Sequence, residues 1–494
     1  MHGDKLRTSW GRFTRRQPPP HREAYTKIVA TIGPASEGLV GDLMDVGMDV
    51  ARINFSHGSH EDHRRRIGII RREAEKRGLE IGILADIAGP KPRLGEVAQG
   101  SYRLREGEVV QLFEGERSDL PGRVPVATSG LIERLEKGHR ILLADGAVEL
   151  VADRAAEGTC VEATVKSSGR IANRKGIALP NSTLDLEVPT EKDRADLELV
   201  RELSIDFCGI SFVSGPEQVE EVRSLVPEAW MVAKIERACA VENVERIIEA
   251  ADGIMVARGD LGVELDFERL PAIQKALLHA ALSRGKFTIT ATEMLESMVV
   301  ASRPTRAEVS DVAHAILEGT DAVMLSAETA VGADPVAAVR VMNTVANSVE
   351  SSQRENELPR LGSHGREPSF ANAIARAAAG AAEILGVKCI VCFTESGATP
   401  RILSQHRPQA EVLALSPHSP TLRRTSVLAH VRPIAFPRST SLEEMLERAC
   451  GVLLEMGKVA VGDIVVFVAG VPPGVVRSTN VLKLHRIGDP IKLA

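Results

Sequence analysis

Short apolar runs recur from Thr26 to about residue 350, and most of them precede a segment with the amphipathic spacing of a helix, such as Glu61–Arg77, Pro216–Leu225 and Pro271–Arg284. Runs that are apolar on both faces are typical of buried parallel strands. Eight such units predict a TIM (β/α)8 barrel, an α/β fold with its active site at the carboxyl ends of the strands. The expected strands are Lys27–Ile32, Val50–Phe55, Ile81–Asp86, Phe207–Val213, Met231–Glu236, Gly253–Val256, Phe287–Thr292 and Ala322–Ser326.

The rhythm of strand and helix breaks after the third expected strand. Residues 89–184 show short strands, glycine turns and alternating patterns, which predict a small inserted β-barrel, an all-β lid domain beside the mouth of the larger barrel. The large barrel would then be built from residues 24–88 and 185–350.

A second alternation of strands and helices follows a polar linker at residues 351–368. Residues 369–494 predict a separate open-sheet α/β domain. Its expected helices and strands are Asn372–Leu385, Leu442–Met456, Lys388–Thr394, Glu411–Leu415 and Asp463–Val468.

Residues 1–23 are rich in arginine and contain three consecutive prolines. A targeting peptide is one interpretation, but the segment lacks the apolar stretch of a secretory signal. We expect a disordered basic tail.

Composition narrows the function classes. The net charge of -6 and the 3% of aromatic residues argue against nucleic-acid binding. No apolar run approaches the roughly 20 residues needed to span a bilayer, so we expect no membrane segment. The six cysteines are spread thinly, which indicates a reducing compartment and predicts a cytoplasmic protein. Cys389 and Cys392 lie three apart in one expected strand and would face opposite ways.

Polar side chains stand at the carboxyl ends of most expected strands. Lys234 and Glu236 are two apart and point to one side of a strand, and Asp260 follows the next strand in a glycine-rich turn. Glu236 and Asp260 could give Mg²⁺ two carboxylate ligands, leaving other positions for water and substrate. The alternative is a surface ion pair and an ordinary turn. The other strand-end positions are Asn54, Ser56, Asp86, Ser211, Thr292 and Ser326.

One loop of the α/β domain is a candidate phosphate site. Thr394–Thr399 follows a strand and leads into a helix, and its hydroxyls and glycine could hold a phosphate at the helix N-terminus. Simple helix capping is the open alternative. The positions concerned are Thr394, Ser396, Gly397 and Thr399, with Gly470–Gly474 as a second candidate loop.

From about Thr26 to the end, the chain resembles the pyruvate kinase family. The motifs that carry the resemblance are long and stand in the family's order: Thr31–Ser36, Val50–Gly58, Lys234–Glu236, Arg258–Gly262, Ala291–Met298, Pro304–Ala313 and Met324–Thr329.

The resemblance implies transfer of the phosphoryl group of phosphoenolpyruvate to ADP in glycolysis, giving ATP and pyruvate. It also implies a homotetramer under allosteric control. Glu236 and Asp260 would bind Mg²⁺, or Mn²⁺ in its place. Lys234 and Arg52 would neutralise the phosphoryl group, and Thr292 would lie next to the path of the proton. The implied substrate contacts also include Ala257, Arg258, Gly259, Asp260 and Ser326, and the nucleotide contacts Asn54, His57, Arg93 and Lys175.

Two departures from the family pattern stand out. The residues matching the usual K⁺ ligands are Asn54, Ser56, Asp86 and Ile87, and Ile87 has no side-chain oxygen. Lys91 replaces an acid nearby, and its ammonium could stand in for the monovalent cation. The chain therefore resembles the branch that works without K⁺; the alternative is a solvated Lys91 and a K⁺ site that persists.

Glu293 replaces the usual glutamine after Thr292, and its charge could hinder the enolate or pair with an arginine. Glu395, beside the effector loop, disfavours a second phosphate and so favours a sugar monophosphate or AMP as effector.

Two rival functions are a Mg²⁺-dependent aldolase or mutase acting on enolpyruvate and a catalytically silent metabolite sensor. The inserted lid and the C-terminal domain argue against the first. The presence of Lys234, Glu236 and Asp260 argues against the second.

Overall fold

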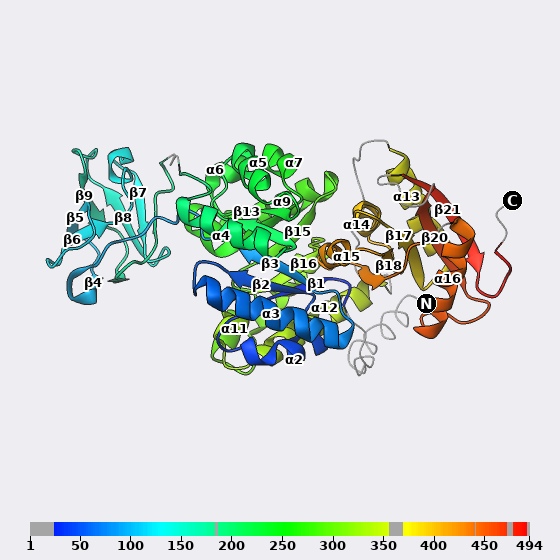
Figure 1. Cartoon of the computed structure of the whole chain (residues 1–494). Helices are drawn as coiled ribbons and strands as arrows, with labels where there is room; N and C mark the ends of the chain where they lie inside the picture. Colours follow the sequence, from blue (N-terminus) through cyan, green and yellow to red (C-terminus); the bar gives the residue numbers. More distant parts are fainter. Residues whose placement is uncertain (1–23, 183–185, 355–368, 440, 472–477, 492–494) are drawn as a thin grey trace, which may run out of the picture.

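The computed structural model describes residues 24–182, 186–354, 369–439, 441–471 and 478–491. Figure 1 shows three bodies in a row: an all-β lid, a central barrel and a C-terminal α/β domain. The expected basic tail, most of the expected linker and most of the second effector loop lie outside the described residues.

The central body is a closed parallel barrel with strand order β1-β16-β15-β14-β13-β12-β3-β2. The prediction of a TIM barrel is confirmed. Each strand is buried along most of its length, as its continuous apolar run requires. The strands are β1 (Lys27–Thr31), β2 (Val50–Asn54), β3 (Gly82–Asp86), β12 (Phe207–Ile210), β13 (Trp230–Ile235), β14 (Gly253–Ala257), β15 (Phe287–Ala291) and β16 (Ala322–Leu325).

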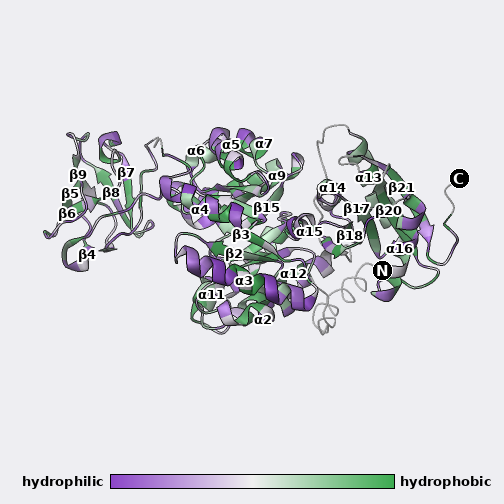
Figure 2. Ribbon diagram, in the orientation of Figure 1, coloured by the Kyte–Doolittle hydropathy of each residue, from purple (hydrophilic) through white to green (hydrophobic). Residues whose placement is uncertain are grey.

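Helices surround the barrel and turn their polar faces outward, as the hydropathy colours of Figure 2 show. Several begin at a capping box: Ser59, Thr190 and Thr305 each accept from a backbone N–H three residues later. The helices are α2 (Val40–Asp45), α3 (His60–Arg77), α4 (Glu191–Glu202), α5 (Pro216–Leu225), α6 (Ala238–Glu242), α7 (Val244–Ala250), α8 (Arg258–Glu264), α9 (Leu270–Ser283), α10 (Arg306–Leu317), α11 (Ala327–Ala330) and α12 (Pro335–Arg354).

The lid interrupts the barrel between β3 and α4. It contains a six-stranded sheet of order β11-β7-β8-β9-β5-β6 and a two-stranded sheet, β10-β4. A separate apolar core, including Leu112, Ile141 and Leu150, fills it. Its strands are β4 (Ser101–Leu104), β5 (Val109–Glu114), β6 (Arg123–Val126), β7 (Arg140–Leu143), β8 (Val148–Ala152), β9 (Cys160–Val165), β10 (Gly169–Ala172) and β11 (Ile177–Ala178).

The C-terminal domain is an open sheet of order β19-β18-β17-β20-β21, in which β21 alone runs antiparallel to its neighbour. Cys389 and Cys392 are free and pack into different cores on the two sides of β17. The elements are α13 (Phe370–Leu385), β17 (Cys389–Phe393), α14 (Ala398–Gln405), β18 (Glu411–Ser416), α15 (Ser419–Thr425), β19 (Val431–Ala435), α16 (Leu442–Glu455), β20 (Ile464–Gly470) and β21 (Thr479–Arg486). Across the described ranges of the chain, no helix combines the length and apolarity needed to cross a membrane.

Candidate functional site

A buried cluster of charges occupies the carboxyl ends of β2, β3 and β13. The Lys234 ammonium lies 3.0 Å from Asp86 Oδ1 and 2.8 Å from Glu236 Oε1, and it donates to Ser211 Oγ at 2.7 Å. Arg52 donates through Nε to the other Asp86 oxygen at 2.8 Å and through Nη1 to Thr31 Oγ1 at 2.8 Å. Lys234 and Glu236 therefore form a buried pair and not a surface one, and two cations share one carboxylate.

Lys234 and Asp86 hold each other ionised. Burial raises the pKa of Asp86, but Lys234 and Arg52 outweigh it and leave that pKa below its ordinary value. Burial lowers the pKa of Lys234, yet Asp86 and Glu236 raise it well above the usual range for lysine. The Lys234 ammonium is thus a fixed positive charge at physiological pH.

Glu236 and Asp260 line the same small cavity between the barrel and the lid, with a volume of about 30 Å³. Burial raises the pKa of Glu236, Lys234 opposes the rise, and the nearby Asp260 carboxylate adds to it. A divalent cation would relieve this repulsion, and two carboxylates suit Mg²⁺, which keeps water and substrate as further ligands. No group of three or more His, Cys, Asp or Glu side chains placed to hold a metal occurs within the described ranges. The two carboxylates of Glu236 and Asp260 fit a metal that takes its remaining ligands from water and substrate.

Lys91 does not join the oxygens of Asn54, Ser56 and Asp86, where we predicted it as a substitute for K⁺. Its ammonium lies 2.8 Å from Asp260 Oδ1 and 3.1 Å from Asp145 Oδ1 in the lid. Two carboxylates thus hold Lys91, whereas Asp86 is paired with Arg52 and Lys234. Burial lowers the pKa of Lys91, but Asp260 and then Asp145 outweigh it and raise that pKa.

Thr292 and Glu293 end β15 in the left-handed region, with φ values of 70° and 53°. The Arg258 guanidinium donates to the Thr292 carbonyl at 2.7 Å and also contacts Asp311 of α10. Gly259 N donates to Thr292 Oγ1 at 2.7 Å, so this amide of the expected carboxylate cradle already has an acceptor. The side chain of Glu293 is exposed.

The expected nucleotide residues form two groups. Asn54 lies beside Asp86 in the register of β2 with β3, and His57 is exposed in the loop that follows, as is Ser56. Arg93 and Lys175 are also exposed and lie on adjacent lid segments, joined by a backbone bridge between Arg93 and Gly176.

Ser326 follows β16, and its hydroxyl is buried without a hydrogen-bond partner in the described part of the chain. Its N–H donates to Glu328 Oε2 at 2.7 Å, and the other Glu328 oxygen accepts from Leu295 N at 3.1 Å. Glu328 thereby ties the end of β16 to the segment after Thr292.

Sequence reasoning did not assign three residues that this geometry uses: Ser211, Asp311 and Asp145. Ser211 shared the strand-end position of the assigned residues and could have been added on that signal. The only sequence signal at Asp145 was the pattern of a hairpin turn, which does not indicate a role in the site.

The expected effector loop begins α14. Thr394 Oγ1 accepts from Gly397 N at 2.9 Å, and Thr399 shares a hydrogen bond of 2.7 Å with Thr479. Ser396 is half-buried in the same loop. The Glu395 carboxylate lies 2.8 Å from His418 Nε2 and 3.6 Å from the Arg438 guanidinium. Gly397 is the N-cap residue of α14 and no side chain caps the helix, so Thr394 stabilises the turn that precedes the helix.

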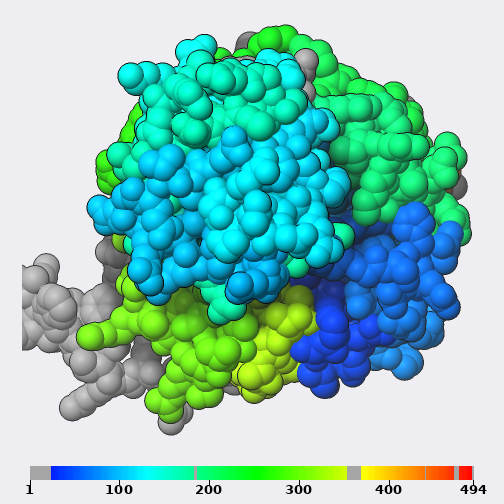
Figure 3. All heavy atoms as spheres, turned by 90° about the vertical axis from the view of Figure 1, so that its left-hand side faces the viewer, coloured from blue at the N-terminus to red at the C-terminus, as the bar shows by residue number. Residues whose placement is uncertain are grey.

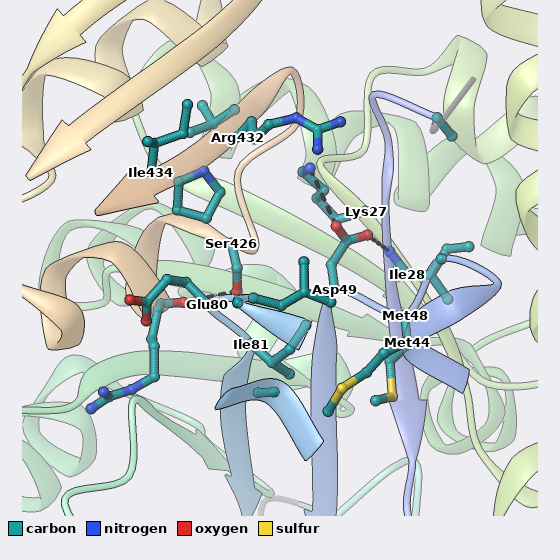
Figure 4. Close-up of a pocket in the computed structure, with 18 of the residues that line it drawn as sticks. Lys27, Ile28, Met44, Met48, Asp49, Glu80, Ile81, Ser426, Arg432 and Ile434 are labelled. Carbon is teal, nitrogen blue, oxygen red and sulfur yellow. Dashed lines mark hydrogen bonds and ion pairs between the residues drawn. The ribbon is translucent and has the colours of Figure 1, made fainter. Parts of the chain in front are cut away.

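A much larger cavity, about 720 Å³, lies at the opposite end of the barrel, against the C-terminal domain. Figure 4 shows Lys27 and Asp49 on the barrel side, joined at 3.3 Å, facing Arg432 and Ile434 of β19. Because it adjoins the amino ends of the strands, this cavity is remote from Lys234 and Asp260.

Comparison with known proteins gives a consistent result. The family model described as "Pyruvate kinase, barrel domain" matches residues 23–339, and "Pyruvate kinase, alpha/beta domain" matches residues 372–485. Pyruvate kinases of Staphylococcus aureus strains MRSA252 and USA300 are each 41% identical over 473 residues, covering 94% of this chain and 81% of theirs. A crystal structure of a pyruvate kinase from Cryptosporidium parvum is 31% identical, with a TM-score of 0.86, covering 94% of this chain and 96% of that one.

Proposed function

This chain belongs to the pyruvate kinase family, and from that premise we propose which of its residues carry the reaction. The enzyme is a phosphotransferase of glycolysis: it transfers the phosphoryl group of phosphoenolpyruvate to ADP and yields ATP and pyruvate. The aldolase, mutase and sensor alternatives are not supported. Phosphoryl transfer needs mainly positioning and charge neutralisation from the protein, so the fixed cations are the residues of interest.

Lys234 and Arg52 are our candidates for neutralising the charge of the phosphoryl group. Both cations are buried and oriented by Asp86, and this shared anchor is the observation that carries the assignment. A preorganised charge of this kind costs no reorganisation when the phosphoryl group moves. Lys234 also neutralises the enolate oxygen left behind. Thr292, held by Gly259 N, positions the proton that converts the enolate to pyruvate.

The family generally uses Mg²⁺, and we assign its ligands here to Glu236 and Asp260; Mn²⁺ would serve as a substitute. When bound, the ion would neutralise charge on the phosphate and carboxylate of phosphoenolpyruvate. The N-terminal turn of α8 and Ser326 complete the surroundings of the substrate. Asn54, His57, Arg93 and Lys175 bind the nucleotide, and the latter two would reach it from the lid.

We further propose that catalysis does not need K⁺. Ile87 is 1% exposed and offers no oxygen, while Arg52 and Lys234 neutralise the Asp86 carboxylate that would face such an ion. Lys91 adds a cation on the Asp260 side of the site.

The test is pyruvate formation from phosphoenolpyruvate, ADP and Mg²⁺ in K⁺-free buffer and again with KCl at matched ionic strength. Equal high rates are expected. A rate that appears only with KCl would keep the kinase and discard the K⁺-independent assignment.

Regulation and assembly extend the proposal. A phosphorylated effector, a sugar monophosphate or AMP, would bind at Thr394–Thr399, where Arg438 adds a cation beside Glu395. An activation screen in which only fructose 1,6-bisphosphate worked would overturn this choice. We expect a homotetramer in the cytoplasm, and the exposed apolar side chains of Phe370 and Ile384 on α13, at 86% and 85%, offer a surface for self-association. Sedimentation at the mass of a monomer or dimer would contradict it.

A further inference from the structure

Lys91 joins three parts of the molecule that are far apart in sequence. It lies on the segment that leads from β3 into the lid, whereas Asp260 belongs to α8 of the barrel and Asp145 to the lid hairpin between β7 and β8. The ammonium contacts both carboxylates, at 2.8 Å and 3.1 Å. One lysine thus connects the lid to a carboxylate that we assign to the metal.

The hairpin tip is shaped around this contact. Ala144 and Asp145 both adopt left-handed conformations, with φ values of 52° and 57°, and Ala144 N donates to the Gly176 carbonyl at 2.9 Å. A β-carbon on Gly176 would lie 2.5 Å from Asp145 Oδ1 and 3.2 Å from Lys91 Cε. The hairpin turn places Asp145 within reach of Lys91, and the absence of a β-carbon at Gly176 leaves room for the Asp145 carboxylate.

The lid contacts the barrel at its mouth. Figure 3 shows the lid in front of part of that end of the barrel, with other parts of the barrel visible beside it. Arg140 of β7 lies 3.6 Å from Asp266, and the cavity between lid and barrel at Glu236 and Asp260 is small. The contacts of Lys91 with both carboxylates therefore lie at the junction of the lid and the barrel.

A divalent cation on Asp260 and the Lys91 ammonium on the same oxygen exclude each other by space and by repulsion of like charge. Asp145 is a second anion within reach of that ammonium, so the lysine keeps a partner when it leaves Asp260.

We propose that Lys91 is a latch that competes with the divalent cation for Asp260, and that Asp145 is the positioning residue that retains the displaced ammonium. The Asp145 carboxylate thereby favours metal binding to Asp260, because it pairs with the displaced Lys91 ammonium. The same pair holds Lys91 close to the site. This inference rests on the proposed metal site at Glu236 and Asp260.

The experiment is a Mn²⁺ titration of the full-length, substrate-free protein, followed by the electron paramagnetic resonance signal of the free ion. Lys91→Met removes the competitor and is expected to tighten Mn²⁺ binding about two- to fivefold, the range available to a half-exposed ion pair. Asp145→Asn keeps the left-handed turn, which asparagine tolerates, and is expected to weaken binding by a similar factor. The double variant should match Lys91→Met, because Asp145 acts only through Lys91.

Asp119→Asn is the matched control. This carboxylate is also on the lid, but it pairs with Arg117 of the lid itself, so Mn²⁺ affinity should not change. If Asp145→Asn weakens binding equally without Lys91, Asp145 acts through its own charge and the latch is overturned. An unchanged affinity in Lys91→Met overturns it as well.

The Glu236→Gln variant tests the proposed metal site independently of the Lys91 latch. A loss of Mn²⁺ affinity in that variant, together with no effect at Lys91, would discard the latch and keep the site. No loss would discard the metal assignment, and the latch with it.

Discussion

At the scale of single residues, the central feature is an ammonium held by two carboxylates. Lys234 is 8% exposed, Asp86 1% and Glu236 2%, so water screens their mutual attraction little. The cluster carries two cations, counting Arg52, against the carboxylates of Asp86 and Glu236. Anionic substrate groups would therefore meet cations whose positions are already fixed by the protein.

Lys234→Met is expected to lower kcat about 10³-fold. The loss corresponds to a charge interaction of about 4 kcal/mol at the transition state. The change also leaves two buried carboxylates without their shared partner, so circular dichroism and thermal unfolding must show that the variant is folded. The comparison is the double variant Lys234→Met with Asp86→Asn, which removes one of these carboxylates. A folded single variant with kcat within tenfold of wild type would contradict the assignment.

At the scale of elements, α10 holds the end of β15 in its unusual conformation. Arg258 stands at the start of α8, and its guanidinium forms an ion pair with Asp311. It also donates to the carbonyl oxygens of Thr292 and Glu293, at 2.7 Å and 3.3 Å. Left-handed backbone at two consecutive non-glycine residues persists only when its surroundings impose it. The side chain of Arg258 therefore supports the backbone of Thr292 and Glu293.

Asp311→Asn is expected to lower kcat about tenfold with little change in the KM for phosphoenolpyruvate. Loss of the carboxylate frees the guanidinium, and Thr292 then departs from its position while the binding cations stay in place. Asp311→Glu should recover most of kcat because it restores the charge. Steady-state kinetics of both variants test this. An equal rise in KM, or failure of the glutamate to recover activity, would indicate a structural role only.

At the scale of the whole molecule, the barrel and the C-terminal domain are joined by buried carboxylates at the amino ends of strands. Asp321 accepts from Thr288 N at 2.9 Å, from Arg407 Nη1 at 2.7 Å and from Ala429 N at 3.3 Å. The Asp206 carboxylate likewise forms ion pairs with the guanidinium groups of Arg71 and Arg423, at 2.8 Å each. The proposed effector loop leads into the first turn of α14, and Arg407 follows the end of that helix. Asp321 accepts from Arg407 and directly precedes β16, so it connects α14 to the barrel.

Asp321→Asn is expected to lower the free energy of unfolding by about 3 kcal/mol, since it leaves Arg407 largely buried beside a neutral group. Urea unfolding at pH 7 measures the change, and we expect the barrel and the C-terminal domain to unfold at separate midpoints in the variant. The control is Asp463→Asn, whose partner Lys388 is mostly exposed, with an expected change within about 0.5 kcal/mol. Equal stability of the two variants would show that the junction does not depend on Asp321.

The sequence by itself determined the barrel, because the apolar runs that become β1 or β13 are local signals, and both faces of each strand are buried. It also determined that Lys234, Glu236 and Asp260 gather at one end, because parallel strands share a carboxyl edge. It did not predict β21 (Thr479–Arg486), an edge strand whose alternation is irregular and whose burial comes from one side only.

Only the tertiary structure decided the partner of Lys91. Its contact with Asp260 joins residues 169 positions apart, and the contact with Asp145 depends on where the lid rests. Composition and spacing carry no information about these side-chain contacts, because the packing of one domain on another determines them. The same holds for the side chain of Arg258, whose contacts with the Thr292 carbonyl and with Asp311 of α10 join three separate segments of the barrel.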